Sequence, residues 1–242
     1  MSIEPHGASD PDFTFAFQPI VDTQAREVVS YEALIRGPGK ESAHQILRQV
    51  PADTMYAFDQ NARVKAIGLA LRLGISCNLN LNFLPRSLGS STESILTTLE
   101  AAKGANLPVN RIVLEAVEGE IIDDTSHFIE LINKYRGLGL MVAIDDFGAG
   151  YSGLNLLADF QPDQVKLDMK LIRGIERHGA RQAIVRAINQ ICLDLGIDVI
   201  AEGVETELEY AWLASQGIHL YQGYLFAKPG FESFPKVHYP EI

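Results

Sequence analysis

The stretch FAFQPIVDTQAREVVSYEAL, residues 15–34, contains two β-rich runs that lie close together in the chain. The runs cover residues 15–21 and 28–34, so that only residues 22–27 connect them. Parallel strands need a crossover of about a dozen residues or more, and this connection is too short for one. We therefore expect the two runs to form an antiparallel hairpin.

Beyond this hairpin, short β-rich runs alternate with longer segments of helical periodicity, a pattern typical of βαβ units and a mostly parallel sheet. Eight strand candidates in all favour a closed α/β barrel of the TIM (β/α)8 type, modified so that its first strand is antiparallel to the rest. The other strands are expected at residues 75–82, 111–117, 140–145, 164–167, 198–201 and 221–226. The clearest helices are expected at residues 59–73, 93–105, 125–138, 181–195 and 205–216.

The chain of 242 residues suits one barrel domain, which we expect over residues 14–242. Residues 1–13 are acidic and contain Pro and Gly, so they predict a flexible N-terminal tail. This tail lacks the basic and apolar regions of a signal peptide. No apolar run approaches the roughly 18 residues that a membrane span needs, so a cytoplasmic location is expected.

The net charge of −11 comes from 20 Lys and Arg against 31 Asp and Glu. Such an acidic surface repels phosphate backbones, which argues against a DNA or RNA polymer or an anionic membrane as partner. A ligand that carries phosphate would need a local source of positive charge. The only cysteines, Cys77 and Cys192, offer neither a disulfide framework nor the spacing of a zinc site.

Polar residues stand at the carboxyl ends of the expected strands, where a barrel gathers its chemistry at one mouth. Clustered carboxylates repel one another, so they persist only where a cation or shared protons neutralise them. Oxygen donors without thiolate or histidine suit Mg²⁺ or Mn²⁺ better than zinc. The adjacent Asp145 and Asp146 could bridge two such ions. The strand-end residues are Glu32, Asn82, Glu115, Asp145, Asp146, Lys166 and Glu202.

Six short motifs along the chain resemble a known pattern. They are FQPIV at 17–21, YEALIRG at 31–37, DDFGAGYS at 145–152, VKLD at 165–168, AEGVET at 201–206 and QGYLF at 222–226. In this order they resemble the EAL domain family, phosphodiesterases of the bacterial messenger cyclic di-GMP. The resemblance extends from about residue 15 to 229, and so suggests a stand-alone EAL domain.

The resemblance implies hydrolysis of cyclic di-GMP to linear 5′-pGpG by a water that two divalent cations, Mg²⁺ or Mn²⁺, activate. One cation would be held by Glu32, Asn82, Glu115 and Asp145, and the second by the adjacent aspartates Asp145 and Asp146. Whether Lys166 or Glu202 activates the water is left open. The implied metal ligands are Glu32, Asn82, Glu115, Asp145, Asp146 and Glu202, and the catalytic set is Lys166, Glu202, Glu32 and Asp146.

The same resemblance implies that Gln18, Leu34, Arg36 and Gln222 contact the dinucleotide. Among them, the guanidinium of Arg36 suits a phosphate oxygen. Family members commonly dimerise, so a homodimer and a regulatory protein stay open as partners beside cyclic di-GMP. Three further residues are expected to support the site from behind: Glu118, Glu205 and Asp168.

The asparagine ligand departs from the usual Asn-x-Ser-Pro setting of the family, because Phe83, Leu84 and Pro85 follow Asn82. Asn80 lies on the same strand face at period two, so a shift in register would put it in place of Asn82. The downstream Pro85 and Leu88 favour Asn82.

Two alternatives rest on single motifs. Residues 148–153, GAGYSG, match the glycine pattern of folds that bind a nicotinamide dinucleotide cofactor, with Asp163 or Asp168 as the ribose ligand. The two aspartates just before this motif would face the pyrophosphate, which argues against it. A lysine at a barrel strand end, here Lys166, could also form a Schiff base with a carbonyl substrate. Surrounding carboxylates would raise its pKa and keep it from acting as a neutral nucleophile.

A third alternative is a catalytically silent receptor for cyclic di-GMP, or a protein-binding regulatory module. Family members that have lost catalysis usually lack the first glutamate, the loop aspartates or the lysine. Glu32, Asp145, Asp146 and Lys166 are all present here, which favours an active enzyme.

Overall fold

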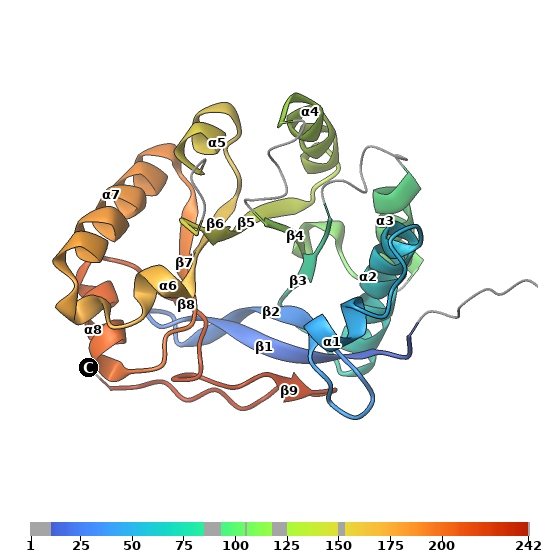
Figure 1. The fold of residues 1–242 in the computed structure, drawn as a ribbon, viewed down its shortest axis with the longest axis horizontal. Coiled ribbons are helices and arrows are strands. Elements are labelled where there is room, and N and C mark those ends of the chain that lie inside the picture. Colours follow the sequence, from blue (N-terminus) through green and yellow to red (C-terminus); the bar gives the residue numbers. More distant parts are fainter. Residues whose placement is uncertain (1–10, 85–92, 105, 118–124, 150–152, 242) are drawn as a thin grey trace, which may run out of the picture.

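A computed structural model describes residues 11–84, 93–104, 106–117, 125–149 and 153–241 of the chain (Figure 1). Eight strands close into a barrel, because β8 pairs with β1 and β1 also pairs with β2. A short ninth strand adds to β1. The strands are β1 (Thr14–Asp22), β2 (Glu27–Arg36), β3 (Asn78–Asn82), β4 (Ile112–Val117), β5 (Met141–Phe147), β6 (Gln164–Leu167), β7 (Asp198–Ala201), β8 (Leu220–Tyr221) and β9 (Gly230–Phe231).

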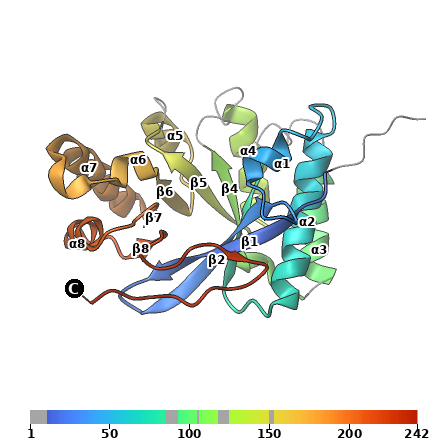
Figure 2. The same cartoon turned by 60° about the horizontal axis from the view of Figure 1, so that its bottom comes forward.

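Strands β1 and β2 form the expected antiparallel hairpin, and each pair of neighbours from β2 round to β8 is parallel. Figure 2 shows the C-terminal segment running across this hairpin. The modified α/β barrel is therefore confirmed. A closed barrel lacks the crevice in which an open doubly wound sheet binds a nicotinamide cofactor. The alternative that residues 148–153 bind such a cofactor therefore does not hold.

Helices surround the barrel on its outside (Figure 1). The five predicted helices correspond to α2, α3, α4, α7 and α8, with ends that differ by a few residues. The short helices α1, α5 and α6 carry no clear periodicity and were not predicted. The helices are α1 (Ala43–Leu47), α2 (Met55–Arg72), α3 (Glu93–Gly104), α4 (Thr125–Arg136), α5 (Gly153–Asp159), α6 (Met169–Ile172), α7 (Gly179–Leu195) and α8 (Glu207–Ser215), with 3-10 turns at η2 (Val109–Arg111) and η5 (Ile175–Arg177).

Two predicted strand ends were wrong. Strand β3 begins at Asn78 and not at residue 75, because Gly74, with φ of 78°, and Ile75 still complete the end of α2. Strand β8 ends at Tyr221 and not at residue 226. A Cβ at Gly223 would lie 2.0 Å from the carbonyl oxygen of Val204, so the chain turns there in close contact with the segment after β7.

The main core lies between the barrel and its helices. Inside the barrel, Ile20, Ile200 and Leu220 form a second, small apolar cluster. Of the expected tail, residues 1–10 lie outside the described part, whereas Phe13 is buried and its ring lies 4.7 Å from that of Phe58. No helix in the described ranges is long and apolar enough to span a membrane.

Candidate metal centre at the barrel mouth

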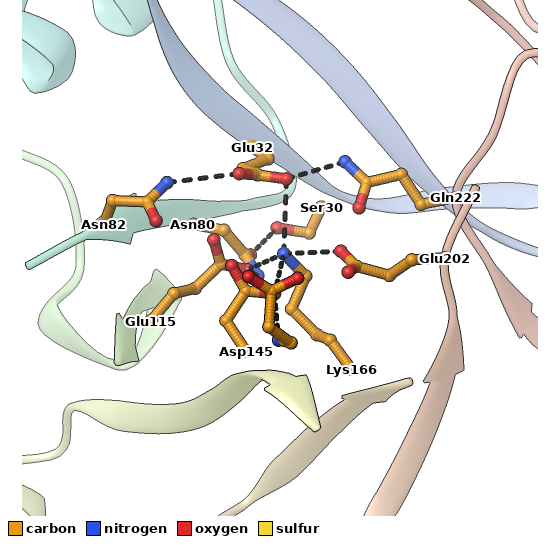
Figure 3. A network of polar contacts seen from close by, with 10 residues as sticks. Ser30, Glu32, Asn80, Asn82, Glu115, Asp145, Lys166, Glu202 and Gln222 are labelled. Carbon is orange, nitrogen blue, oxygen red and sulfur yellow. Dashed lines mark hydrogen bonds and ion pairs between the residues drawn. The ribbon is translucent and has the colours of Figure 1, made fainter. Parts of the chain in front are cut away.

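The ammonium group of Lys166 lies at the centre of the barrel, fully buried, among four carboxylates (Figure 3). Its Nζ is 2.7 Å from Glu202, 2.9 Å from Glu115, 3.1 Å from Asp145 and 3.2 Å from Glu32. The five side chains come from β2, β4, β5, β6 and the residue after β7. The closed barrel thus brings together residues that are up to 170 positions apart in the chain.

The period of two along each strand explains why these side chains meet. Alternate residues of a barrel strand point inward, and the carboxyl ends of the parallel strands share one end of the barrel, its mouth. Asn82 lies opposite Glu115 in the pairing of β3 with β4, and Gln18 lies opposite Glu32 in the hairpin. We refer to Glu32, Glu115, Asp145, Asp146 and Glu202 as the mouth carboxylates.

The mouth carboxylates outnumber the positive charge that the described residues place beside them. Five carboxylates against the one ammonium of Lys166 leave four negative charges if all are ionised. Burial, together with the charges of Glu32 and Asp145, raises the pKa of Glu115 to about 8. Burial and the same neighbours also raise the pKa of Glu202 well above its usual value. Without added positive charge, part of this cluster must therefore hold protons.

The pKa of Lys166 is also raised, but for a different reason. Burial alone lowers the pKa of an ammonium, but Asp145, Glu115 and the other two carboxylates outweigh it and raise the pKa of Lys166 well above its usual value. A lysine that keeps its proton is a poor amine nucleophile, which argues against the Schiff-base alternative.

The donor set fits a divalent cation. Glu32, Glu115 and Asp145 each offer an oxygen within 4.8 Å of the others, and Asp145, Asp146 and Glu202 do the same. Oε2 of Glu115 is buried and has no hydrogen-bond partner among the described residues. A buried acceptor without a donor is costly, and a hard cation such as Mg²⁺ or Mn²⁺ would satisfy it.

Amide side chains hold Glu32 in place at the mouth (Figure 3). Nδ2 of Asn82 donates to its Oε1 at 3.1 Å, and Nε2 of Gln222 donates to its Oε2 at 2.8 Å. Asn80 lies deeper, fully buried, and its Nδ2 donates to Oε1 of Glu115 at 2.7 Å. Of the two asparagines, Asn82 is thus the one beside Glu32 at the mouth.

The two adjacent aspartates are held by local backbone geometry. Asp146 has a φ of 53°, an unusual value for a residue other than Gly, and its N–H donates to Oδ1 of Asp145 at 3.0 Å. Burial, Asp145 and Asp168 raise the pKa of Asp146 to about 6. Asp168 also accepts the N–H of Lys170 at 2.5 Å and so caps α6, which links this helix to the site.

The residues expected to bind the dinucleotide lie around this centre. Gln18 is buried and its side chain donates to the carbonyl of Ala227 at 3.2 Å. Arg36 is half-buried, and its guanidinium donates to the carbonyl of Ile35 at 2.7 Å. Leu34 lines a cavity of about 790 Å³ that also borders Glu32 and reaches toward α1 and α2.

One of the remaining two support residues lies away from the centre. Glu205 is exposed and pairs with Arg173, whose Nη2 donates to it at 2.8 Å. Glu118 lies outside the described residues.

Sequence reasoning missed two features near the centre. One is the hydroxyl of Ser30, which donates to Oδ1 of Asn80 beneath the mouth. Its position two residues before Glu32 was the available signal, because both side chains then point into the barrel. The other is the buried ion pair of Asp59 and Arg63 on α2, which lines the cavity.

Fold and site together define a class: an α/β barrel with a cluster of carboxylates at its carboxyl-end mouth. The model of the EAL domain matches residues 6–229, and the chain belongs to this family.

Two characterised relatives come from Escherichia coli (strain K12). The blue light- and temperature-regulated antirepressor BluF is 36% identical over 228 residues, which are 94% of this chain and 57% of that protein. The cyclic di-GMP phosphodiesterase PdeR is 33% identical over 226 residues, 88% of this chain and 33% of that protein. The chain therefore spans little more than half, or less, of these relatives.

Two solved structures resemble the fold closely. A standalone versatile EAL protein from Vibrio cholerae O395, in its c-di-GMP bound form, gives a TM-score of 0.91 at 49% identity, covering 96% of this chain and 98% of that chain. A manganese and cyclic di-GMP complex of Klebsiella pneumoniae BlrP1 gives a TM-score of 0.88 at 38% identity, covering 96% of this chain and 59% of that chain.

Proposed function

We propose that this chain is a phosphodiesterase that uses two divalent cations, Mg²⁺ or Mn²⁺, to hydrolyse cyclic di-GMP to linear 5′-pGpG. The observation that carries this proposal is the buried Oε2 of Glu115, which no described residue partners, within a cluster of carboxylates that a single ammonium cannot neutralise. Two relatives support it: one is named a cyclic di-GMP phosphodiesterase, and another was solved with manganese and the dinucleotide.

The proposal divides the donors between two positions. When bound, the cations would stabilise negative charge on the phosphoryl group and leaving oxygen and lower the pKa of a water molecule. Two such ions would also match the four negative charges that the ionised centre carries. The first position would use Glu32, Asn82, Glu115 and Asp145, and the second would use Asp145, Asp146 and Glu202.

Lys166 and Glu202 would have distinct parts. Lys166 keeps its proton, so its ammonium would hold the carboxylates in one arrangement and stabilise negative charge near Nζ. Oε1 of Glu202 lies 2.7 Å from Nζ of Lys166. The raised pKa of Glu202 suits a group that takes a proton from water.

Substrate binding would start from the positive and apolar groups around the mouth. The guanidinium of Arg36 suits a phosphate oxygen, and Gln18 and Gln222 offer amide groups for the dinucleotide. Gln222 is buried, and its Oε1 has no hydrogen-bond partner, so it can accept one from a ligand. The cavity of about 790 Å³ beside Leu34 would accept an apolar, planar part of the substrate, such as a base.

The experiment is incubation of the purified protein with cyclic di-GMP and Mg²⁺ or Mn²⁺, with products separated by chromatography. We expect the linear dinucleotide only with the cation, and none after chelation or with Glu32→Ala. Glu207→Ala, which removes an exposed carboxylate on α8, is the matched control and should keep full activity. Product formed equally by a folded Glu32→Ala variant would refute the proposed mechanism.

A second candidate is a regulatory module that binds cyclic di-GMP or a protein without turnover. It is favoured by the relative named as an antirepressor, which is 36% identical to this chain. Saturable binding of cyclic di-GMP without product, at every cation tested, would support this function instead. A cytoplasmic location, a homodimer and a regulatory protein partner stay predictions.

A further inference from the structure

A chain of buried polar groups runs beneath the mouth, from β2 through β3 to β4 (Figure 3). The hydroxyl of Ser30 donates to Oδ1 of Asn80, and Nδ2 of Asn80 donates to Oε1 of Glu115 at 2.7 Å. Ser30 is 3% exposed, and Asn80 and Glu115 are fully buried. No solvent therefore competes for these hydrogen bonds, and each group depends on its neighbour.

The order of donors in this chain can run in only one direction. With a cation bound, Glu115 is ionised and only accepts hydrogen bonds, so Asn80 must then present its NH₂ group to Glu115. Its carbonyl oxygen then faces β2, where the Ser30 hydroxyl is the donor. The carboxylate thus selects the orientation of the Asn80 amide, and the Ser30 hydroxyl stabilises that orientation by donating to the carbonyl oxygen.

This orientation determines which oxygen of Glu115 is engaged. Asn80 and Lys166 both donate to Oε1, the latter at 2.9 Å, while no residue in the described part of the chain donates to Oε2. Lys166 cannot impose this alone, because its ammonium is shared with three other carboxylates. The amide of Asn80 contacts Glu115 alone among the mouth carboxylates in the described hydrogen bonds, and so supplies the directional contact.

We propose that Ser30 and Asn80 are positioning residues that turn Oε2 of Glu115 toward a divalent cation. The inference rests on the proposed function for the identity of the cation and deepens it. Outer-shell partners of metal ligands typically contribute 10–100-fold to metal affinity or activity. Neither residue is expected to contact the substrate, since both lie beneath the carboxylates.

The first measurement is the affinity for Mn²⁺ alone, from the electron paramagnetic resonance signal of free Mn²⁺. We expect Asn80→Ala to weaken binding by about tenfold or more, and Ser30→Ala by a smaller factor. The double variant should be no weaker than Asn80→Ala, because Ser30 acts only through Asn80. A purely structural role for each residue would give additive losses.

The matched control is Gln164→Leu. Gln164 is also a buried amide inside the barrel, two residues before Lys166 on β6, and its Oε1 has no hydrogen-bond partner. No described hydrogen bond joins it to a mouth carboxylate, so Mn²⁺ affinity should be unchanged. In the hydrolysis assay, Ser30→Ala should lower kcat with little change in KM, since the dinucleotide contacts are intact.

The outcomes separate this inference from the proposed function. Folded Ser30→Ala and Asn80→Ala proteins with wild-type Mn²⁺ affinity would overturn the inference, as would an equal loss with Gln164→Leu. If Asn80→Ala does not fold, the result with Ser30→Ala decides. Wild-type protein that binds Mn²⁺ but yields no product would overturn the proposed function, while the affinities still judge the inference. Absence of Mn²⁺ binding would overturn both.

Discussion

Glu115 on β4 and Glu209 on α8 are both buried carboxylates, yet their surroundings differ in one respect. Glu209 accepts the N–H of Gly174 at 2.8 Å on Oε1, and the N–H groups of Glu205 and Thr206, each at 3.0 Å, on Oε2. Within the described ranges, both donors of Glu115 meet on Oε1, and its Oε2 has none. Each oxygen of Glu209 accepts a hydrogen bond from the chain, whereas Oε2 of Glu115 accepts none from the described residues.

The pKa values of the two groups move in opposite directions. Burial raises the pKa of Glu115, the charge of Glu32 adds to this effect, and the result is about 8. Burial also acts to raise the pKa of Glu209, but the hydrogen bonds from Gly174, Glu205 and Thr206 outweigh it, and the pKa is lowered. Protein donors thus stabilise the ionised form at Glu209. At Glu115 the described donors do not suffice, so the group either takes up a proton or needs an external cation to stay ionised.

The largest expected difference concerns activity. Glu115→Gln should lower cyclic di-GMP hydrolysis by more than about a hundredfold, because loss of even an outer-shell partner costs up to that factor. Glu209→Gln should keep hydrolysis within about threefold of wild type at a temperature where it is folded, because it only affects stability. Initial rates by chromatography check both. Comparable losses in the two variants would remove the distinction between the two carboxylates.

The next effect is on thermal unfolding. Mn²⁺ at about 100 times its Kd should stabilise the wild-type protein by about 2.7 kcal/mol, which for a chain of this size corresponds to an increase of about 5–10 °C in Tm. Glu209→Gln should show the same increase from a lower starting point. Glu115→Gln should show little increase. Differential scanning fluorimetry with and without chelator measures the shift, and an equal increase in both variants would speak against Glu115 as a ligand.

A smaller effect is expected on stability without cation. Glu209→Gln presents an amide NH₂ where backbone N–H groups need an acceptor, so the free energy of unfolding should fall by about 2 kcal/mol. Glu207→Gln, on the exposed side of the same helix, should change it by less than about 0.5 kcal/mol. Urea unfolding followed by circular dichroism gives both values. A neutral Glu209→Gln would mean that its hydrogen bonds do not stabilise the fold.

The smallest expected effect is the pH dependence of the difference in unfolding free energy between wild type and Glu209→Gln. Because the pKa of Glu209 is lowered on folding, its contribution is complete above the unfolded value of about 4.3 and is lost as the pH falls through the folded value. The gap in unfolding free energy between wild type and Glu209→Gln should thus be constant from pH 6 to 8 and shrink below about 4. A gap that widens in acid would contradict the sign of this shift.

Much of the fold could be predicted because the sequence signals are local. The short connection after Asp22 determines the antiparallel hairpin, and the alternation of strand and helix patterns determines the parallel remainder. The start of β3 and the end of β8 could not be placed. They depend on the turn at Gly74 and on the approach of Gly223 to Val204, which are contacts made in three dimensions.

The residues of the candidate site could likewise be predicted only in part from the sequence. Glu32, Glu115, Asp145, Lys166 and Glu202 could be named from their places at strand ends, and the structure brings all five together. Glu205 illustrates the limit, because its partner Arg173 lies 32 residues away and sequence position alone does not reveal the pair.

The sequence by itself determined which side chains face the barrel interior, because a period of two along each strand is a local property of the backbone. Only the tertiary structure decided how those side chains share their hydrogen bonds. Closure of the barrel brings Asn80 and Lys166 to Oε1 of Glu115 and leaves its Oε2 without a donor among the described residues. Glu209 instead has a donor for each oxygen, from the capping box that starts α8 and from the N–H of Gly174. Whether a buried carboxylate supports the fold or is available to a cation follows from that allocation of donors.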